Sequence, residues 1–379
     1  PIGPIVEQVA GSNDPLQEFT GEVPRELFVG DLMEVLNSAA TDDRVQNILL
    51  RLDNINGTGQ SVLYDVGNAL QKLKDAGKKI IAVGDYYTRS SYYLASFADE
   101  IILNTDGIVE LYGFGRSRLF YKSLLDKLKI DFNVFRVGTF KSAVEPYIAD
   151  EMSSAAKEAN LSYLNVLWDS YKDVVAKNRG LSASEIQNLV DNADVILTNP
   201  DESTAEALKS YGLVDKLLPR TKTRTYLKEI FGESEDGKTF ARISGYDYFQ
   251  LLRSEKEQES SKDIISVIVA RGTIVDGVQP PGMIGGDSTS RLIREAHEDK
   301  NVKAIVLRVD SGGGGVFASE QIRLELMEAK EKGITFIASM GNVAASGGYW
   351  ISANADEIWA SHNTITGSIG IFGLLPTFD

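Results

Sequence analysis

Cysteine is absent from the 379 residues, and this absence removes several chemistries at once. Without cysteine the chain has no disulfide framework, no thiolate nucleophile and no cysteine-ligated zinc. Histidine occurs only twice, as His297 in a charged helix end and as His362 in a polar turn. We expect both at the surface, and we expect no metal site formed by the pair. Any nucleophilic serine in this chain is therefore expected to lack a histidine base.

Long apolar runs and clusters of basic residues are also missing. No apolar run reaches about 18 residues, so the sequence predicts no transmembrane helix, and no signal peptide is recognisable at the start. The formal net charge is -15 without a long basic run, which argues against a nucleic-acid partner. Apolar residues make up 43% of the chain, enough for ordinary globular cores. The length predicts two or three domains.

The chain does contain an internal repeat. Residues 98–101 recur with the same four letters at 355–358, and residues 50–54 resemble 307–311 at the same separation. The second copy stops at the position equivalent to residue 122, and the first copy has no strand matching 264–270. The repeat therefore predicts a chain truncated at both ends relative to a complete tandem duplication.

Each copy is expected to alternate strands with helices. In the first copy the expected elements lie at 31–40, 47–52, 61–76, 79–83 and 100–103. In the second copy they lie at 264–270, 288–298, 304–309, 318–332, 334–339, 348–355 and 357–360. The stretch without a second copy is expected to form elements at 121–129, 131–137, 153–178, 182–191 and 205–211, with a return strand at 212–215. This alternation predicts an α/β fold, a tandem duplication of a βαβ unit with mostly parallel sheets.

The sequence suggests three segments. We assign an N-terminal repeat with a helical extension to 1–253 and a C-terminal repeat to 263–379. Between them, 254–262 is charged and has no apolar period, which is typical of a linker.

Ser346 stands on a small-residue turn between an expected strand and an expected helix. Gly347 and Gly348 follow it and let another backbone approach closely. A helix N-terminus at this point directs N–H groups and a partial positive charge at the serine oxygen, which suits a nucleophile or an oxyanion. Tight packing of a strand against a helix is the alternative explanation.

The two copies differ at this turn and at one other loop. The first copy has Arg89 in the place of Ser346, and it has Ile55-Asn56-Gly57 where the second copy begins the run Gly312–Gly315. Both loops follow strands, and open α/β sheets bind ligands at the C-terminal ends of their strands. Backbone N–H groups of the two loops can converge as an oxyanion hole. The alternative is a flexible glycine turn, and no Gly-Lys-Ser/Thr follows to indicate a phosphate loop.

A serine without histidine needs another base, and a neutral lysine can serve. Lys141 follows an expected buried strand, 131–137, and a glycine turn at Gly138, and we expect it in the first turn of a helix. Burial and a helix N-terminus both disfavour the ammonium form. The alternative is a solvated lysine, as at most helix starts.

Three stretches, 138–146, 340–350 and 366–370, together resemble signal peptide peptidase A in its long, duplicated bacterial form, also called protease IV. The resemblance covers nearly the whole chain, including the duplication. It implies a fold of the Clp-protease/crotonase type and a serine endopeptidase that degrades cleaved signal peptides with a Ser–Lys dyad, without metal or cofactor. It also implies a membrane-associated homo-oligomer, a tetramer-like ring, at the bacterial cytoplasmic membrane, with the catalytic part facing the periplasm or the outside.

The resemblance assigns roles to individual residues. It implies Ser346 as the nucleophile, Lys141 from the other repeat as the general base, Ser368 as the serine that orients the lysine amine, and Gly347 with Gly313 or Gly314 as oxyanion-hole donors. A plain turn is the alternative role of Ser368.

The chain departs from the family pattern at one loop, and the sequence also leaves two alternative functions. The family usually has Ser-Pro-Gly-Gly where this chain has Ser311-Gly312-Gly313-Gly314, and the missing proline loosens the loop. A crotonase-like enzyme acting on acyl-CoA thioesters would use similar oxyanion amides with a glutamate acid/base. A non-catalytic membrane-associated scaffold would retain the duplication only for assembly.

Overall fold

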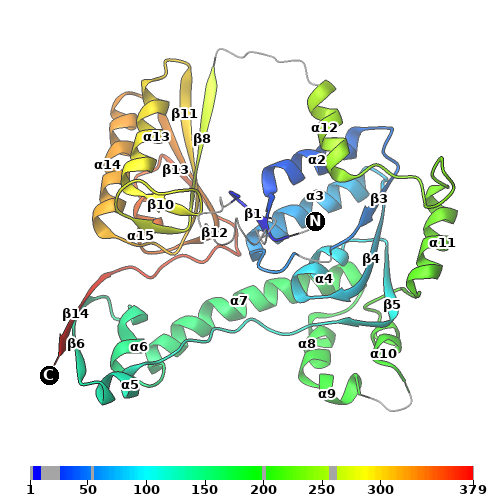
Figure 1. Ribbon diagram of the computed structural model, residues 1–379, viewed down its shortest axis with the longest axis horizontal. Helices are drawn as coiled ribbons and strands as arrows, with labels where there is room; N and C mark the ends of the chain where they lie inside the picture. Colours follow the sequence, from blue (N-terminus) through cyan, green and yellow to red (C-terminus); the bar gives the residue numbers. More distant parts are fainter. Residues whose placement is uncertain (1–2, 10–25, 53–54, 199–201, 256–262, 379) are drawn as a thin grey trace. The chain divides into compact units, whose positions relative to one another are not determined.

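The computed structural model describes residues 3–9, 26–52, 55–198, 202–255 and 263–378 (Figure 1). The chain divides into two compact units. Unit 1 consists of Pro1–Gly113 and Asp169–Ser260, and unit 2 consists of Phe114–Trp168 and Ser261–Asp379. Most of the expected linker, 256–262, lies outside the described residues. Its first two residues instead end helix α12 (Gly245–Glu255).

Unit 1 is built on a parallel sheet with the strand order β3-β4-β5-β7. The strands are β3 (Asn47–Leu50), β4 (Lys79–Tyr87), β5 (Glu100–Val109) and β7 (Lys216–Leu217). The helices before, between and after them include α2 (Val29–Thr41), α3 (Gln60–Asp75), α4 (Arg89–Ala95), α8 (Ala183–Asp191), α10 (Thr204–Ser210) and α11 (Arg220–Phe231). Ile80, Ile81 and Ala82 have no exposed surface, as expected for a central strand of a parallel sheet. The return strand lies just after the predicted range 212–215.

Unit 2 repeats this plan with the strand order β13-β12-β11-β8, again parallel. Its strands are β8 (Ile264–Arg271), β11 (Val302–Ser311), β12 (Thr335–Ala344) and β13 (Glu357–Trp359). Its helices are α13 (Gly286–Glu298), α14 (Val316–Glu331) and α15 (Gly347–Trp350). The order β11-β12-β13 matches β3-β4-β5 of unit 1, which confirms the α/β prediction and the duplicated unit. Helix α15 is shorter than the predicted 348–355.

The duplication extends to a pair of small sheets. In unit 1, β1 (Ile5–Val6) pairs in parallel with β2 (Leu27–Phe28), directly before α2. In unit 2, β9 (Thr273–Val275) pairs in parallel with β10 (Met283–Gly285), directly before α13. Each copy therefore keeps a two-stranded sheet in front of its first helix.

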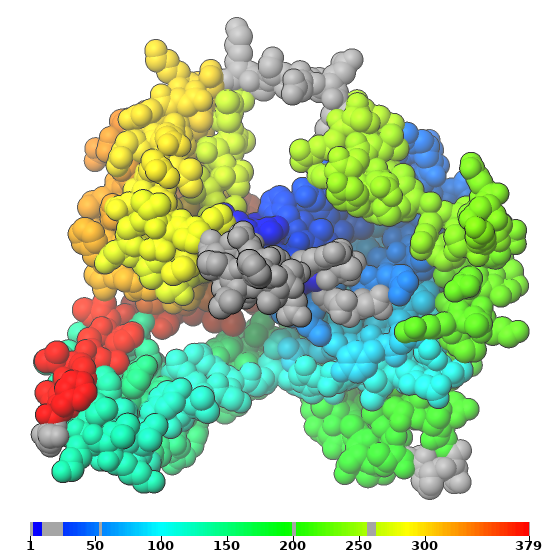
Figure 2. All heavy atoms as spheres, in the orientation of Figure 1, coloured from blue at the N-terminus to red at the C-terminus, as the bar shows by residue number. Residues whose placement is uncertain are grey.

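The predicted domain boundary differs from the unit boundary. Segment Phe114–Trp168 belongs to unit 2, whereas the sequence pattern places it in the N-terminal repeat 1–253. The reason is an antiparallel pairing of β14 (Ile371–Phe378) with β6 (Ile130–Val137) along the full length of both strands (Figures 1 and 2). This pairing joins residues far apart in the chain, so the local sequence pattern does not reveal it.

The unduplicated stretch carries the other unit 2 elements. They are α5 (Lys122–Lys127), the 3₁₀ turn η1 (Ser142–Val144), α6 (Glu145–Ile148) and the first part of α7 (Ser154–Arg179). Strand β6 is not buried as predicted, since Phe135 and Val137 are about two thirds exposed. Among the helices of the described ranges, none has the length and apolarity needed to cross a membrane.

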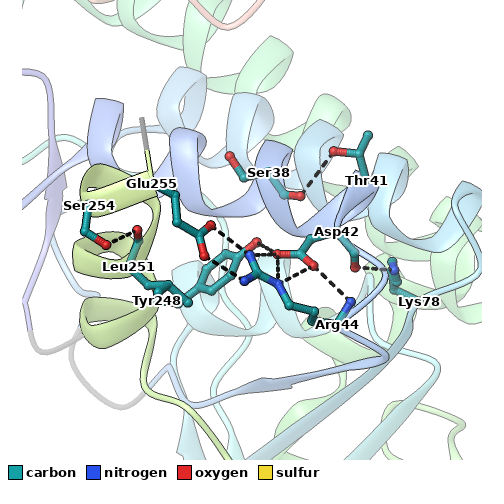
Figure 3. Close-up of polar contacts among 9 residues, drawn as sticks. All are labelled: Ser38, Thr41, Asp42, Arg44, Lys78, Tyr248, Leu251, Ser254 and Glu255. Atoms are coloured by element: carbon teal, nitrogen blue, oxygen red, sulfur yellow. Dashed lines mark hydrogen bonds and ion pairs between the residues drawn. The ribbon is translucent and has the colours of Figure 1, made fainter. Parts of the chain in front are cut away.

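Helix α12 is held to the end of α2 by polar contacts (Figure 3). The Arg44 guanidinium lies between the carboxylates of Asp42 and Glu255 at 2.8 Å from each, and the Tyr248 hydroxyl donates to Asp42. Arg44 is 57% exposed, and exposed ion pairs contribute little to stability. The cluster therefore fixes the direction of α12 more than it stabilises unit 1.

Candidate active site

Ser346 occupies the sharp turn between β12 and α15 in unit 2. Its backbone has φ 51° and ψ -118°, a conformation that residues with a Cβ rarely adopt and that costs about 1–3 kcal/mol. Two flanking hydrogen bonds hold it: Ser346 N–H donates to the Gly367 carbonyl at 2.9 Å, and Ala345 N–H donates to the Ser311 carbonyl at 3.0 Å. The turn thus presents the serine side chain in a strained position fixed by its neighbours.

Lys141 meets Ser346 inside unit 2. Its Nζ lies 2.9 Å from Ser346 Oγ, 2.7 Å from the Ser368 carbonyl and 3.1 Å from Ser368 Oγ. The lysine is only 5% exposed, and none of these three partners is a carboxylate. Burial lowers the pKa of the Lys141 ammonium below its ordinary value. The three residues therefore form a compact group in which the lysine is biased toward its neutral form.

The loop before η1 delivers Lys141 to this place. Lys141 is the residue that precedes η1, and its carbonyl accepts a hydrogen bond from Arg136 at 3.4 Å. Gly138 has φ 110°, and a Cβ at Gly138 would lie 2.8 Å from the Ile369 carbonyl. Only glycine allows this close approach. The glycine turn predicted before Lys141 thus has a steric cause.

A parallel backbone contact fixes Ser368 relative to Ser346. Ile365 N–H donates to the Asn342 carbonyl, and Ala344 N–H donates to the Ile365 carbonyl, both at 2.9 Å. Together with the hydrogen bond from Ser346 N–H to the Gly367 carbonyl, these contacts hold the segment before Ser368 alongside the end of β12. Ser368 itself has φ 50°. Its position is therefore set by the same strand end that carries the serine turn.

Two backbone N–H groups near Ser346 are available for an oxyanion. No described residue accepts a hydrogen bond from the N–H of Gly347 or Gly314. The Gly313 N–H, in contrast, donates to Ser311 Oγ at 3.1 Å. Gly313 has φ 95°, and a Cβ there would lie 2.5 Å from the Gly347 nitrogen. Of the two alternatives in the glycine loop, the geometry favours Gly314 as the donor and gives Gly313 a packing role.

A pocket of about 700 Å³ opens beside these groups. Ser346, Lys141, Gly314 and Gly347 all line it. Its apolar wall is formed by Val137, Val316, Tyr349, Trp350, Ile369, Ile371 and Phe372. The sequence did not predict this wall, because it needs the β6–β14 pairing to bring strand residues next to α14 and α15.

The prediction of a surface position for His297 is wrong. His297 is buried, its Nε2 lies 2.9 Å from Glu325 Oε1, and its Nδ1 lies 2.9 Å from Lys332 Nζ. Because an ammonium can only donate, Nδ1 accepts and Nε2–H donates to Glu325. Together with Glu328, His297 and Glu325 form the one group with metal-ligand spacing within the described ranges, but ion pairs already engage their carboxylates. His362 is exposed, as predicted.

The corresponding place in unit 1 holds an arginine. Arg89 begins α4, and its guanidinium donates to the Gly113 carbonyl at 2.9 Å and lies over the Tyr112 ring at 4.8 Å from the centroid. Gly113 is the repeat counterpart of Gly370, beside Ser368. Arg89 therefore contacts the segment of unit 1 that corresponds to the lysine-binding segment of unit 2.

Comparisons with known proteins find relatives among peptidases. The model of peptidase family S49 matches residues 72–230 and 328–379. The chain is 43% identical to Protease 4 of Salmonella typhi over 100% of this chain and 59% of the relative. It is 29% identical to the chloroplastic serine protease SPPA of Arabidopsis thaliana over 91% of this chain and 50% of that protein. A putative signal peptide peptidase SppA of Enterococcus faecium shares 44% identity over 79 residues, 21% of this chain and 23% of the relative. The chain thus spans between half and three fifths of the two long relatives.

Proposed function

Because the chain belongs to peptidase family S49, we propose that it is a serine endopeptidase with Ser346 as nucleophile and Lys141 as general base. The observation that carries this proposal is the 2.9 Å distance between Lys141 Nζ and Ser346 Oγ at a buried lysine. A nucleophile and its base at this distance are within hydrogen-bond reach, as proton transfer requires.

Acylation begins with the neutral amine of Lys141. The amine takes the proton of Ser346 Oγ while the oxygen attacks the carbonyl carbon of a peptide bond. The negative charge that develops on the substrate oxygen is stabilised by the N–H groups of Gly347 and Gly314. Lys141 then gives its proton to the leaving amine, and an ester links the acyl group to Ser346.

Deacylation uses the same residues in the same order. Lys141, again neutral, removes a proton from a water molecule, which attacks the ester carbonyl. The second oxyanion is stabilised by the same two N–H groups, and the proton returns to Ser346 Oγ when the carboxylic product leaves.

Ser368 orients the base. A neutral lysine amine has two N–H bonds and one lone pair. When the Ser368 carbonyl and hydroxyl oxygens accept both N–H bonds, the lone pair is left toward Ser346. The Ser346 hydroxyl can then donate its proton to that lone pair, so Ser368 favours transfer from Ser346 to Lys141.

The pocket supports an apolar peptide as substrate. Its wall of aliphatic and aromatic side chains suits apolar residues beside the scissile bond. Cleaved signal peptides carry such an apolar stretch, so we propose them as the substrate class. In line with the family resemblance, we also propose that the whole protein is a homo-oligomeric, tetramer-like ring associated with the cytoplasmic membrane, with its catalytic part facing the periplasm or the outside.

The proposal is tested by peptide hydrolysis with single variants. Ser346→Ala and Lys141→Ala are each expected to lose about 10³-fold or more of kcat on an internally quenched apolar peptide, with unchanged circular dichroism. Activity near the wild-type level in either folded variant would refute the dyad. Binding of acyl-CoA by an inactive wild type would instead support the crotonase-like alternative.

A further inference from the structure

We propose that Ser311 is a positioning residue whose hydroxyl holds the glycine loop Gly312–Gly315 in the shape that stabilises the oxyanion. This inference rests on the proposed function. Ser311 is the last residue of β11 and is 2% exposed. The sequence places it at the start of the Ser-Gly-Gly-Gly stretch but assigns it no role.

The Ser311 hydroxyl joins two segments of unit 2. Its Oγ donates to the Gly272 carbonyl at 2.6 Å, directly after β8, and accepts the N–H of Gly313 at 3.1 Å. Its backbone carbonyl accepts the N–H of Ala345 at 3.0 Å. One residue therefore contacts the end of a neighbouring strand, the glycine loop and the serine turn.

These contacts decide which N–H groups reach the pocket. With its N–H engaged by Ser311 Oγ, Gly313 adopts φ 95° and packs against the Gly347 nitrogen, the Ala345 carbonyl and the Ser346 Cβ. Gly314, one residue further on, lines the pocket together with Gly347, whereas Gly313 does not. Losing the Ser311 hydroxyl would release Gly313, and the Gly314 N–H would lose its fixed direction.

The hydroxyl matters in this chain because the loop consists of glycines and has few other restraints. Four consecutive glycines give the loop the greatest conformational freedom available to a polypeptide. Two backbone bonds to Ile274 hold the Gly313 carbonyl and the Gly315 N–H. Among the described residues, Ser311 supplies the one side chain that bonds an N–H group of the loop. A proline at 312, which would restrict φ, is absent.

The first experiment compares Ser311→Ala with Ser352→Ala. Ser352 is also fully buried in unit 2, and its hydroxyl bonds the Gly348 carbonyl without lining the pocket. We expect Ser311→Ala to lower kcat at least tenfold with KM within twofold, because the loop binds the transition state more than the substrate. Ser352→Ala should keep kcat within about threefold. A purely structural role of Ser311 predicts equal effects in the two variants.

A second readout separates positioning from general damage. A peptide aldehyde forms a tetrahedral adduct that needs the oxyanion donors, whereas a product peptide does not. We expect Ser311→Ala to weaken aldehyde inhibition about as much as it lowers kcat, with product inhibition and the pH midpoint of kcat/KM unchanged. Unchanged aldehyde affinity, or a shifted pH midpoint, would overturn the inference.

The decisive variant is a rescue. Gly312 has open space around its Cβ position, and no described residue accepts its N–H. Gly312→Pro should therefore be tolerated and should restrict the loop. We expect the double variant Ser311→Ala/Gly312→Pro to have a kcat at least threefold higher than that of Ser311→Ala. No recovery would contradict positioning by the hydroxyl. Should Ser311→Ala fail to fold, Ser311→Cys, which keeps the volume with a weaker hydrogen bond, is measured in its place and should lose kcat likewise.

The outcomes also separate this inference from the proposed function. A folded wild type that cleaves no peptide and binds no aldehyde overturns both. An active wild type with a fully active Ser311→Ala variant overturns the role of Ser311 alone and leaves the dyad intact.

Discussion

As the proposed base, Lys141 must be neutral to accept a proton, and its burial favours this neutral form. The buried ammonium is disfavoured, so the pKa of Lys141 in the folded chain lies below the ordinary lysine value of 10.5. We predict that kcat/KM rises with pH as Lys141 deprotonates, with a midpoint below 10.5, and a pH–rate profile measures this. A midpoint at or above 10.5, or one unchanged in Lys141→Arg, would contradict it.

The same shift predicts a stability effect. For a lysine with a lowered folded-state pKa, the unfolded chain binds the extra proton, so stability rises with pH between the two pKa values. Lys141→Met removes the buried ammonium and keeps most of the apolar volume. We expect Lys141→Met to be inactive yet at least as stable as the wild type at neutral pH, with the advantage shrinking toward pH 10.5. Urea unfolding across pH tests this, and a variant less stable at neutral pH would count against a costly ammonium.

The backbone of Ser346 is in a strained conformation. Its φ of 51° with ψ of -118° suits glycine better than any residue with a Cβ. We predict that the free energy of unfolding of Ser346→Gly is about 1 kcal/mol higher than that of Ser346→Ala, although neither variant has a nucleophile. Thermal melts of the two variants provide the measurement. Equal stability would mean that the turn relaxes when the hydroxyl is removed.

At the scale of elements, the glycine loop is fitted against β9. A Cβ on Gly314 would lie 1.9 Å from the Ile274 carbonyl oxygen, so the loop must move to accept alanine. We predict that Gly314→Ala lowers kcat at least about 100-fold, in the range for loss of one oxyanion donor. Gly373→Ala is the matched control, because a Cβ there meets nothing within 4 Å. Comparable losses in the two variants would contradict a specific role of the loop.

The helices and strands were largely predictable from the sequence, because each has a local cause. Alternating strands and amphipathic helices placed α13 and β11 within two residues of their observed starts. The buried strand ahead of Ser346 and the glycine turn ahead of Lys141 were likewise visible as patterns. The roles of Ser346, Lys141 and Ser368 came from the family resemblance, since residue patterns alone left a structural alternative for each.

Other features depend on partners far along the chain. Strand β6 was expected to be buried because it is apolar, yet it pairs along one edge with β14 and stays exposed over much of its length. His297 was expected at the surface because its neighbours in sequence are charged, yet Glu325 on α14 receives it in a buried hydrogen bond. Ser311 begins a family motif in the sequence, but the motif assigns it no role, because the proposed role depends on the Gly272 and Gly313 backbone groups around it.

At the scale of the whole molecule, the proposed catalytic group is contained in unit 2. Lys141 and Ser346 are 205 positions apart in the sequence, yet both belong to this compact unit. The lysine comes from the unduplicated stretch and the serine from the second copy, while the first copy has Arg89 in the equivalent place. Of the two equivalent turns, the one in the second copy carries the proposed nucleophile, and the unduplicated stretch carries the proposed base.

The most direct test of the dyad is chemical labelling of the whole chain. A fluorophosphonate is added to the folded protein, and the modified peptide is identified by mass spectrometry. We predict one adduct, at Ser346, that is lost in Lys141→Ala while the fold is retained. A folded wild-type chain that stays unlabelled, or a Lys141→Ala variant labelled at Ser346 as fast as the wild type, would contradict the Ser–Lys dyad.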